Sequence, residues 1–201
     1  MRKGRPKVKT EVRREQITQT VFDIIATKGV KGLTTSAIAR NNGMSEANLY
    51  RHFKNKSEIL ESAVNKIGEG LLRNLETVQS ATSWKPMLKL RRLFELHLKF
   101  IESNKGISRF VYSEEMHMDY HLRGILFQII NGYMSGINRL IKEGQAQGDI
   151  HGKIDPQTLA LSMIGIIQMI TMRWSLKDFS FSLFDEGMSH WKNYARCISA
   201  K

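Results

Sequence analysis

The sequence predicts an all-α protein, in which a three-helix unit near the N-terminus is joined by a linking helix to a larger helical domain. Apolar residues recur at helical spacing, as Ile17, Val21 and Ile24 do, and together they indicate one buried helix face. No segment shows the sustained alternation typical of a strand. The chain has 201 residues, of which 41% are hydrophobic, enough to bury a core in each of two modest domains.

The positive charge is concentrated at the N-terminus. Residues 1–56 contain thirteen Lys or Arg and four Asp or Glu, a balance of +9, so only +3 of the total of +12 falls in residues 57–201. Residues 1–10 form a basic segment with few apolar side chains, and we expect a flexible arm there. The charge points to an anionic partner, either nucleic acid or an anionic membrane surface, unless it serves solubility alone.

The sequence also bears on the compartment. Its single cysteine, Cys197, cannot form an intramolecular disulfide, and the N-terminus lacks the apolar stretch of a secretory signal. The most apolar run, residues 159–174, contains Ser162, Gln168 and Arg173, and we read it as too short to span a bilayer. We therefore expect a cytoplasmic protein with no membrane partner.

Helix start and stop signals divide residues 11–56 into three helices. Gly29 ends the first, Thr34 or Thr35 caps a second over residues 35–42, and Gly43 stops it. Ser45 caps a third over residues 45–53. The pattern is typical of a helix-turn-helix, in which the third helix enters the major groove of DNA.

Residues 57–80 read as one long linking helix that begins near the Asn55–Glu58 capping box. Residues 81–201 form the second domain, with helices near 83–104, 122–147 and 155–174 and from 183 onward. Residues 107–120 look irregular. The helix at 155–174 is apolar on nearly every side, which predicts that it is also covered by another copy of the chain.

Residues 33–60, LTTSAIARNNGMSEANLYRHFKNKSEIL, closely resemble the DNA-binding domain of the TetR family of transcriptional regulators. The resemblance rests on Thr34–Thr35, Ile38–Ala39, Gly43, the block at residues 49–53 and the Lys54–Asn55–Lys56 lead-in. It implies an all-α homodimer that binds operator DNA, with a ligand pocket in the C-terminal domain that controls DNA affinity. We accordingly expect a ligand-responsive repressor, released from a palindromic operator by an effector.

The resemblance also implies roles for individual residues. Thr35, Ser36 and Lys56 would contact phosphate, where helix N-termini favour anions. Tyr50 and His52 would contact backbone or base. The base-reading positions are Glu46, Ala47, Asn48 and Arg51, which the sequence does not assign to particular bases.

The effector site is less well defined by the sequence. Methionine and phenylalanine in the second domain suggest an adaptable apolar interior, although most such residues belong to ordinary cores. His97 is either a core histidine or a ligand anchor. We expect an apolar or amphipathic effector, with these candidate contacts: Phe94, His97, Phe110, Phe127 and Met163.

No reaction, cofactor or metal is predicted. The sequence lacks a nucleotide-binding loop, a His-Glu-x-x-His pattern and a nucleophile in a recognisable setting. Glu114, Glu115, His117, Asp119 and His121 form the one cluster that resembles a metal site, and we read it as a solvated acidic turn or a ligand gate. The alternative function is a basic protein that binds DNA without sequence preference or lies on a membrane surface.

Overall fold

The computed structural model describes residues 10–200, and all its named elements are helical. The predicted all-α fold is confirmed. The expected basic arm, except for Thr10, lies outside the described residues. In chain order the helices are α1 (Thr10–Lys28), the 3-10 turn η1 (Val30–Gly32), α2 (Thr35–Asn41), α3 (Glu46–Leu49), α4 (Lys56–Gln79), α5 (Pro86–Ser103), α6 (Gly106–Val111), α7 (Glu114–Met118), α8 (Tyr120–Ala146), α9 (Pro156–Leu176) and α10 (Leu183–Ile198).

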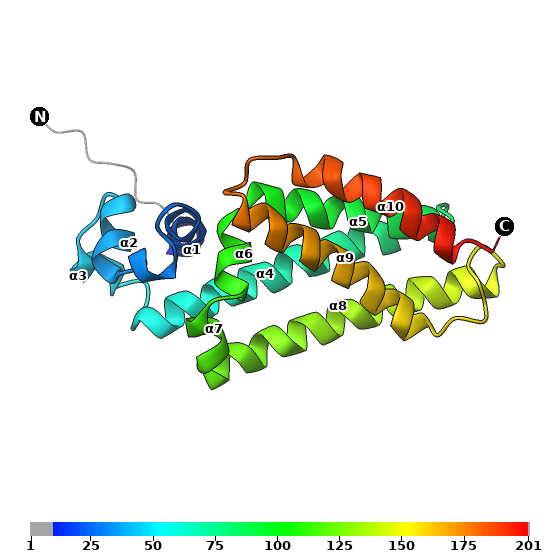
Figure 1. Cartoon of the computed structure of the whole chain (residues 1–201). Coiled ribbons are helices and arrows are strands. Elements are labelled where there is room, and N and C mark those ends of the chain that lie inside the picture. Colours follow the sequence, from blue (N-terminus) through cyan, green and yellow to red (C-terminus); the bar gives the residue numbers. More distant parts are fainter. Residues whose placement is uncertain (1–9, 201) are drawn as a thin grey trace, which may run out of the picture.

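The first three helices form a small unit at one end of an elongated molecule (Figure 1). The hydroxyl of Thr34 accepts a hydrogen bond from the amide of Ala37 at the start of α2, and that of Ser45 accepts one from the amide of Asn48 at the start of α3. Both caps satisfy amides that a helix N-terminus leaves unpaired. Leu49 and Phe53 are buried beneath α3 with the inner face of α1, so the opposite side of α3 is left for a partner.

The third helix is shorter than the expected span of residues 45–53. Its α-helical part covers Glu46–Leu49, and tighter turns follow, in which the amides of Arg51 and His52 donate to the carbonyls of Asn48 and Leu49. The amide of Phe53 still donates to the carbonyl of Leu49. The chain tightens here because Asn55, only two residues after the buried Phe53, already caps α4.

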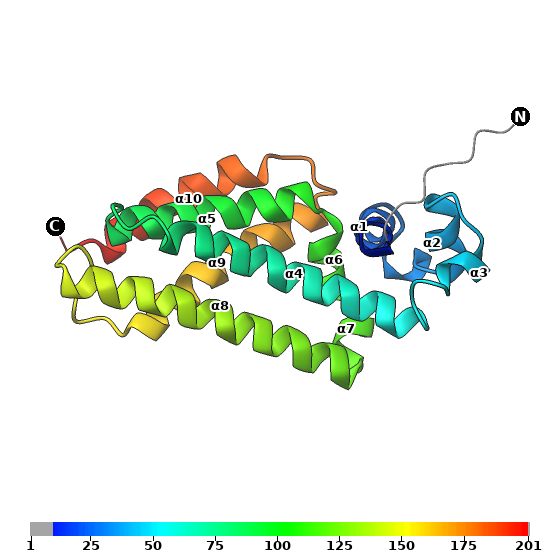
Figure 2. The same cartoon turned by 180° about the vertical axis from the view of Figure 1, so that it is seen from behind.

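The second domain is a bundle around α4, α5, α8, α9 and α10, and Figure 2 shows α4 running from the small unit into it. Residues expected to be irregular form the short helices α6 and α7. Ser113 caps α7 and Asp119 caps α8, so two polar residues of this segment serve as helix caps. α6 packs against α1 on one side and α9 on the other.

Helix α9 corrects one step of the membrane argument. It has 21 residues and is long and apolar enough to cross a membrane by length and composition, so the expected shortness does not exclude a span. Its inner face, however, is buried in the bundle core through residues such as Met163, Ile167 and Trp174. The remaining face carries exposed apolar side chains.

Candidate nucleic-acid interface and effector cavity

The turn between α2 and α3 sets the direction of the recognition helix. Gly43 has a φ of 62°, in the left-handed region that glycine adopts without a steric penalty. The amide of Met44 then donates to the carbonyl of Ala39. Ala39 is buried, and its small side chain allows the two helices to cross closely.

Most of the nine predicted DNA-contacting residues lie on the surface of this unit. Ser36, Glu46, Ala47, Tyr50, Arg51 and Lys56 are exposed, whereas Thr35, Asn48 and His52 are half-buried. Tyr50 is 47% exposed although it is a large aromatic residue. An exposed tyrosine beside exposed basic side chains suits contact with a sugar-phosphate backbone.

Two of the predicted DNA contacts are bonded to each other. The Thr35 hydroxyl donates to a carboxylate oxygen of Glu46 at 2.6 Å, which ties the start of α2 to the start of α3. In this conformation the Thr35 hydroxyl is not free to donate to phosphate. One carboxylate oxygen of Glu46 is occupied by the same bond. Donation from the Thr35 hydroxyl to phosphate requires this bond to break.

Arg14 of α1, which the sequence analysis did not single out, holds the recognition helix in place. Its guanidinium donates to the backbone carbonyl of His52, pairs with Glu58 at 2.9 Å and lies 4.0 Å from the centre of the Phe53 ring. Glu58 also accepts from the amide of Lys54 at 2.6 Å. The Lys54 hydrogen bond and then Arg14 hold the pKa of Glu58 below its usual value, so this junction keeps its charges at neutral pH.

His52 lies close to three arginines. Burial, followed by the charges of Arg13, Arg51 and Arg14, lowers its pKa. The imidazole is therefore neutral at neutral pH, and it would reach DNA as a hydrogen-bonding group rather than as a cation.

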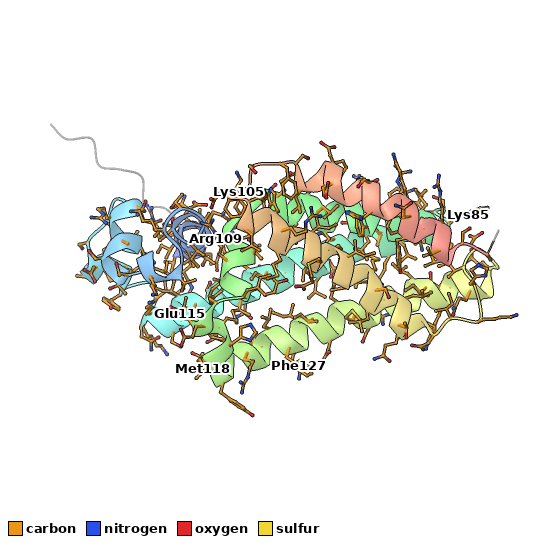
Figure 3. The ribbon with its side chains drawn as sticks, viewed as in Figure 1. Lys85, Lys105, Arg109, Glu115, Met118 and Phe127 are labelled. Atoms are coloured by element: carbon orange, nitrogen blue, oxygen red, sulfur yellow. The ribbon has the colours of Figure 1, made fainter. Side chains whose placement is uncertain are left out.

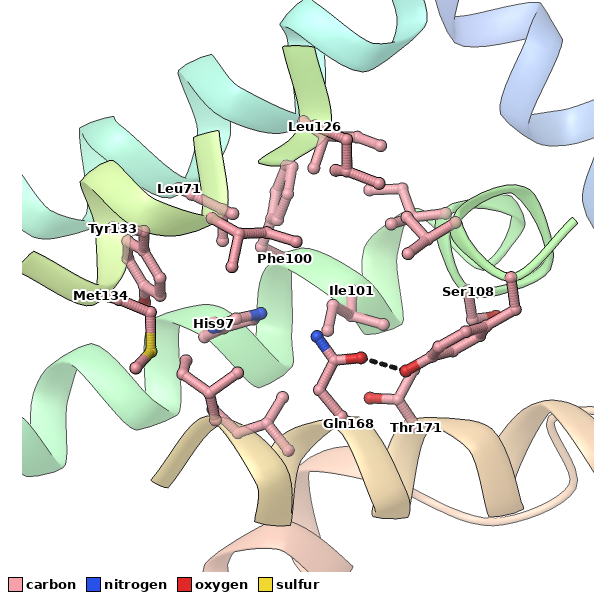
Figure 4. A pocket seen from close by; sticks show the side chains of 17 residues that line it. Leu71, His97, Phe100, Ile101, Ser108, Leu126, Tyr133, Met134, Gln168 and Thr171 are labelled. Carbon is pink, nitrogen blue, oxygen red and sulfur yellow. Dashed lines mark hydrogen bonds between the residues drawn. The ribbon is translucent and has the colours of Figure 1, made fainter. Parts of the chain in front are cut away.

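The second domain contains an apolar cavity of about 70 Å³ between five helices (Figure 4). That volume is smaller than the several hundred Å³ that drug-sized ligands fill, so a ligand of that size must push the lining helices apart. The cavity is lined by Ile67, Leu71, His97, Phe100, Ile101, Ile107, Ser108, Val111, Tyr112, Leu126, Ile130, Tyr133, Met134, Ile164, Ile167, Gln168 and Thr171.

Among the five predicted ligand contacts, only His97 lines this cavity. Phe94 turns toward α10, where its ring centre lies 5.2 Å from that of Trp191, and Phe110 packs against Phe22 of α1. Met163 is fully buried in the core. Phe127 is 60% exposed, on the outer side of α8 (Figure 3). These four residues were predicted from their apolar character alone, and that character reflects packing in the core or at the surface, not a position in the cavity.

Polar residues that the sequence analysis passed over line the cavity with His97. Tyr133 meets the His97 ring edge-on at 5.3 Å between ring centres. Tyr112 is 45% exposed and its hydroxyl donates to the side-chain oxygen of Gln168, and Figure 4 shows this bond beside Thr171. The sequence did contain a signal for this site, namely polar residues on otherwise apolar helix faces.

Burial lowers the pKa of His97 from 6.5 to about 4. Below pH 6.5 the unfolded chain therefore binds a proton that the folded chain does not, and stability is lost as the pH falls from about 6.5 to about 4. This loss amounts to on the order of 3 kcal/mol in the free energy of unfolding, and we expect His97→Phe to abolish it. Urea unfolding at pH 7 and pH 4.5 measures it, with the exposed His117→Phe as the control. Equal losses in the wild type and His97→Phe would contradict the buried, neutral state of His97.

Helix α6 joins the cavity to the DNA-binding unit. Ile107, Ser108 and Val111 line the cavity, while on the same helix Arg109 donates to the Ala26 carbonyl of α1 at 2.6 Å. Arg109 also pairs with Asp178 at 2.8 Å, in the turn after α9. Figure 3 places it at the junction of the two domains. The same short helix therefore contacts both the cavity and α1.

Two family models together cover residues 17–192. "Bacterial regulatory proteins, tetR family" matches residues 17–63, and "YsiA-like protein, C-terminal region" matches residues 64–192. The boundary between the two matches lies within α4, the helix that links the two domains.

Curated relatives and solved structures match along most of the chain. The nucleoid occlusion factor SlmA of Vibrio cholerae is 26% identical over 179 residues, covering 87% of this chain and 91% of its own. The regulator FadR of Bacillus subtilis in complex with stearoyl-CoA is 23% identical, with a TM-score of 0.75, covering 90% of this chain and 97% of its own.

A third match is a regulator from Saccharomonospora viridis, described as a putative transcriptional regulator in complex with choline. It is 22% identical with a TM-score of 0.80, over 94% of this chain and 98% of its own. At these identities the solved structures show a shared fold, and the family models carry the assignment. The resemblance noted in residues 33–60 is thus confirmed: this chain belongs to the TetR family of bacterial regulatory proteins and is a DNA-binding, ligand-responsive transcriptional regulator.

Proposed function

We propose that the protein is a repressor that binds a palindromic operator as a homodimer and is released by an apolar or amphipathic effector. The observation that carries this proposal is the position of α6, which lines the cavity and packs on α1. An effector that expands the cavity displaces α6 and, through it, the recognition helix. The effector shifts the balance only by its difference in affinity for the two conformations.

The exposed face of α9 supports the dimer. Leu161, Met169, Met172 and Leu176 are between 46% and 74% exposed, and Gly165 lies between the first two. Their spacing of eight, three and four residues places them on one stripe of the helix. Such a stripe fits a partner helix, and the neighbouring side of α8 would complete a four-helix contact with the second copy.

We infer a cytoplasmic protein that acts by binding operator DNA and carries out no reaction. The stearoyl-CoA named for the FadR structure supports an effector with a long apolar part. The alternative, a basic protein without sequence preference, is not favoured by membership of this family.

Two substitutions separate contacts that hold the DNA backbone from contacts that read bases. Lys56 is exposed at the first turn of α4. We expect Lys56→Ala to weaken binding about equally on all duplexes and to lower the salt slope by roughly one unit. Asn48→Ala should cost about 1–3 kcal/mol on the operator and much less on random DNA.

Titrations of both variants on operator and random duplexes at several salt concentrations test this division. Circular dichroism first checks that each variant is folded, and the exposed Lys31→Ala, remote from the recognition helix in sequence, is a control for loss of one charge. Asn48→Ala weakening all sequences alike, or Lys56→Ala altering preference without altering the salt slope, would refute the assigned roles.

A further inference from the structure

Three buried polar groups in the cavity lack a hydrogen-bond partner. Within residues 10–200, none is found for Nδ1 of His97, the hydroxyl of Tyr133 or the hydroxyl of Thr171. Their residues are 7%, 2% and 4% exposed. Buried polar groups are almost always paired in folded proteins, so these three atoms point to a molecule that occupies the cavity.

The other polar side chains of the cavity are already engaged. Ser108 donates to the Lys105 carbonyl at 2.9 Å, and Tyr112 donates to Gln168. The unpaired groups come from three helices, α5, α8 and α9. Figure 4 shows Tyr133 and Thr171 on opposite sides of His97, so the hydrogen-bonding positions are spread along the cavity.

The lining offers no charge to balance an ion. Among the described residues that line it, none is acidic, Lys or Arg. Burial lowers the pKa of His97 to about 4 and raises that of Tyr133, so both are neutral at neutral pH. An unpaired ion in such a site suffers a large desolvation penalty.

We propose that this cavity selects a neutral, mainly apolar molecule that carries one or more hydroxyl or carbonyl oxygens, which bond to Tyr133, His97 or Thr171. This deepens the proposed function and rests on its ligand-responsive domain. A hydroxyl or carbonyl oxygen accepts from the Tyr133 or Thr171 hydroxyl, and a ligand hydroxyl also donates to an unprotonated imidazole nitrogen. The apolar part fills the space between Leu71, Ile101 and Ile167.

Three probes with the same chain test the selection: 1-decanol, decanoate and decyltrimethylammonium. Each is titrated by calorimetry into the full-length protein without DNA, below the concentration at which it forms micelles. We expect 1-decanol to bind at least about tenfold more tightly than either ion, because only the ions lose hydration without gaining a counter-charge. Equal or tighter binding of an ion, or no binding of 1-decanol, would overturn the proposal.

Tyr133→Phe tests the anchoring role. It should weaken 1-decanol binding about five- to tenfold, the effect of one hydrogen bond. Since the hydroxyl lacks a partner among the described residues, the stability of the ligand-free protein should not fall. The matched control is Tyr194→Phe, whose buried hydroxyl donates to the Leu159 carbonyl outside the cavity. That variant should lose stability but keep its affinity for 1-decanol.

Thr171→Val provides a second variant of nearly unchanged shape, and it should weaken 1-decanol binding less than Tyr133→Phe does, because a ligand with one oxygen does not reach both ends of the cavity. If neither Tyr133→Phe nor Thr171→Val alters the affinity, the unpaired groups do not hold the ligand and the proposal fails. Operator binding is measured separately. If 1-decanol binds selectively but does not release DNA, this inference stands and effector-controlled repression is refuted. If only an ion releases DNA, effector-controlled repression stands and this inference fails.

Discussion

Gly165→Arg is expected to convert the dimer into a monomer and to weaken operator binding at least about a hundredfold. Gly165 is exposed on α9, and a Cβ added there meets nothing within 4 Å in the described chain. The arginine therefore leaves the protomer intact. In a dimer that closes on the exposed stripe of α9, however, it becomes a buried, unpaired charge, which costs about 3–5 kcal/mol.

Light scattering at micromolar concentration and an operator titration measure the two effects. Gly152→Arg is the matched control, because Gly152 is also open to solvent, before α9, and the change in charge is the same. This control should remain a dimer with wild-type or slightly higher DNA affinity. A Gly165→Arg protein that stays dimeric and binds its operator normally would show that the subunits associate elsewhere.

Gly106→Ala is expected to separate α6 from α1, lowering the free energy of unfolding by about 1–3 kcal/mol, as overpacking of a close contact does. A Cβ at Gly106 would lie 2.0 Å from the backbone oxygen of Phe22. Since backbone cannot yield as a flexible side chain can, the two helices must move apart. If this strain falls on the DNA-binding conformation, operator affinity drops about five- to a hundredfold.

Urea unfolding and an operator titration, both without effector, follow these changes. Gly152→Ala adds the same methyl group where a Cβ has no neighbour within 4 Å among the described residues, so both quantities should stay at wild-type values. Unchanged stability and affinity in Gly106→Ala would mean that α6 does not transmit cavity changes to the DNA-binding unit.

The sequence predicted the long helices well because periodicity and capping are local properties. The expected linking helix, residues 57–80, corresponds to α4 at Lys56–Gln79, and Asp155 and Ser45 cap their helices as expected. α6 and α7 have six and five residues, too short for a period to emerge. α6 is instead fixed by contacts distant in sequence, such as Phe110 with Phe22.

The cavity shows a different limit of sequence reasoning. Periodicity indicates which residues face inward, but it does not indicate which inward residues from five helices leave space between them. Phe94 and Phe127 were chosen for apolar size, and one is core while the other is exposed. Tyr133 and Thr171 carried the better signal in the sequence, because each places a hydroxyl on a mainly apolar helix face and a buried hydroxyl needs a partner. In the structure these two hydroxyls have no partner within residues 10–200.

Repeated selection of duplexes from a random pool by the full-length protein tests the central claim most directly. We predict enrichment of one inverted repeat whose half-sites place two recognition helices in successive major grooves, about 34–36 Å apart. Footprinting should show both half-sites protected together. A pool that stays random while binding weakens steeply with salt would instead show a merely basic DNA-binding protein and would contradict the account.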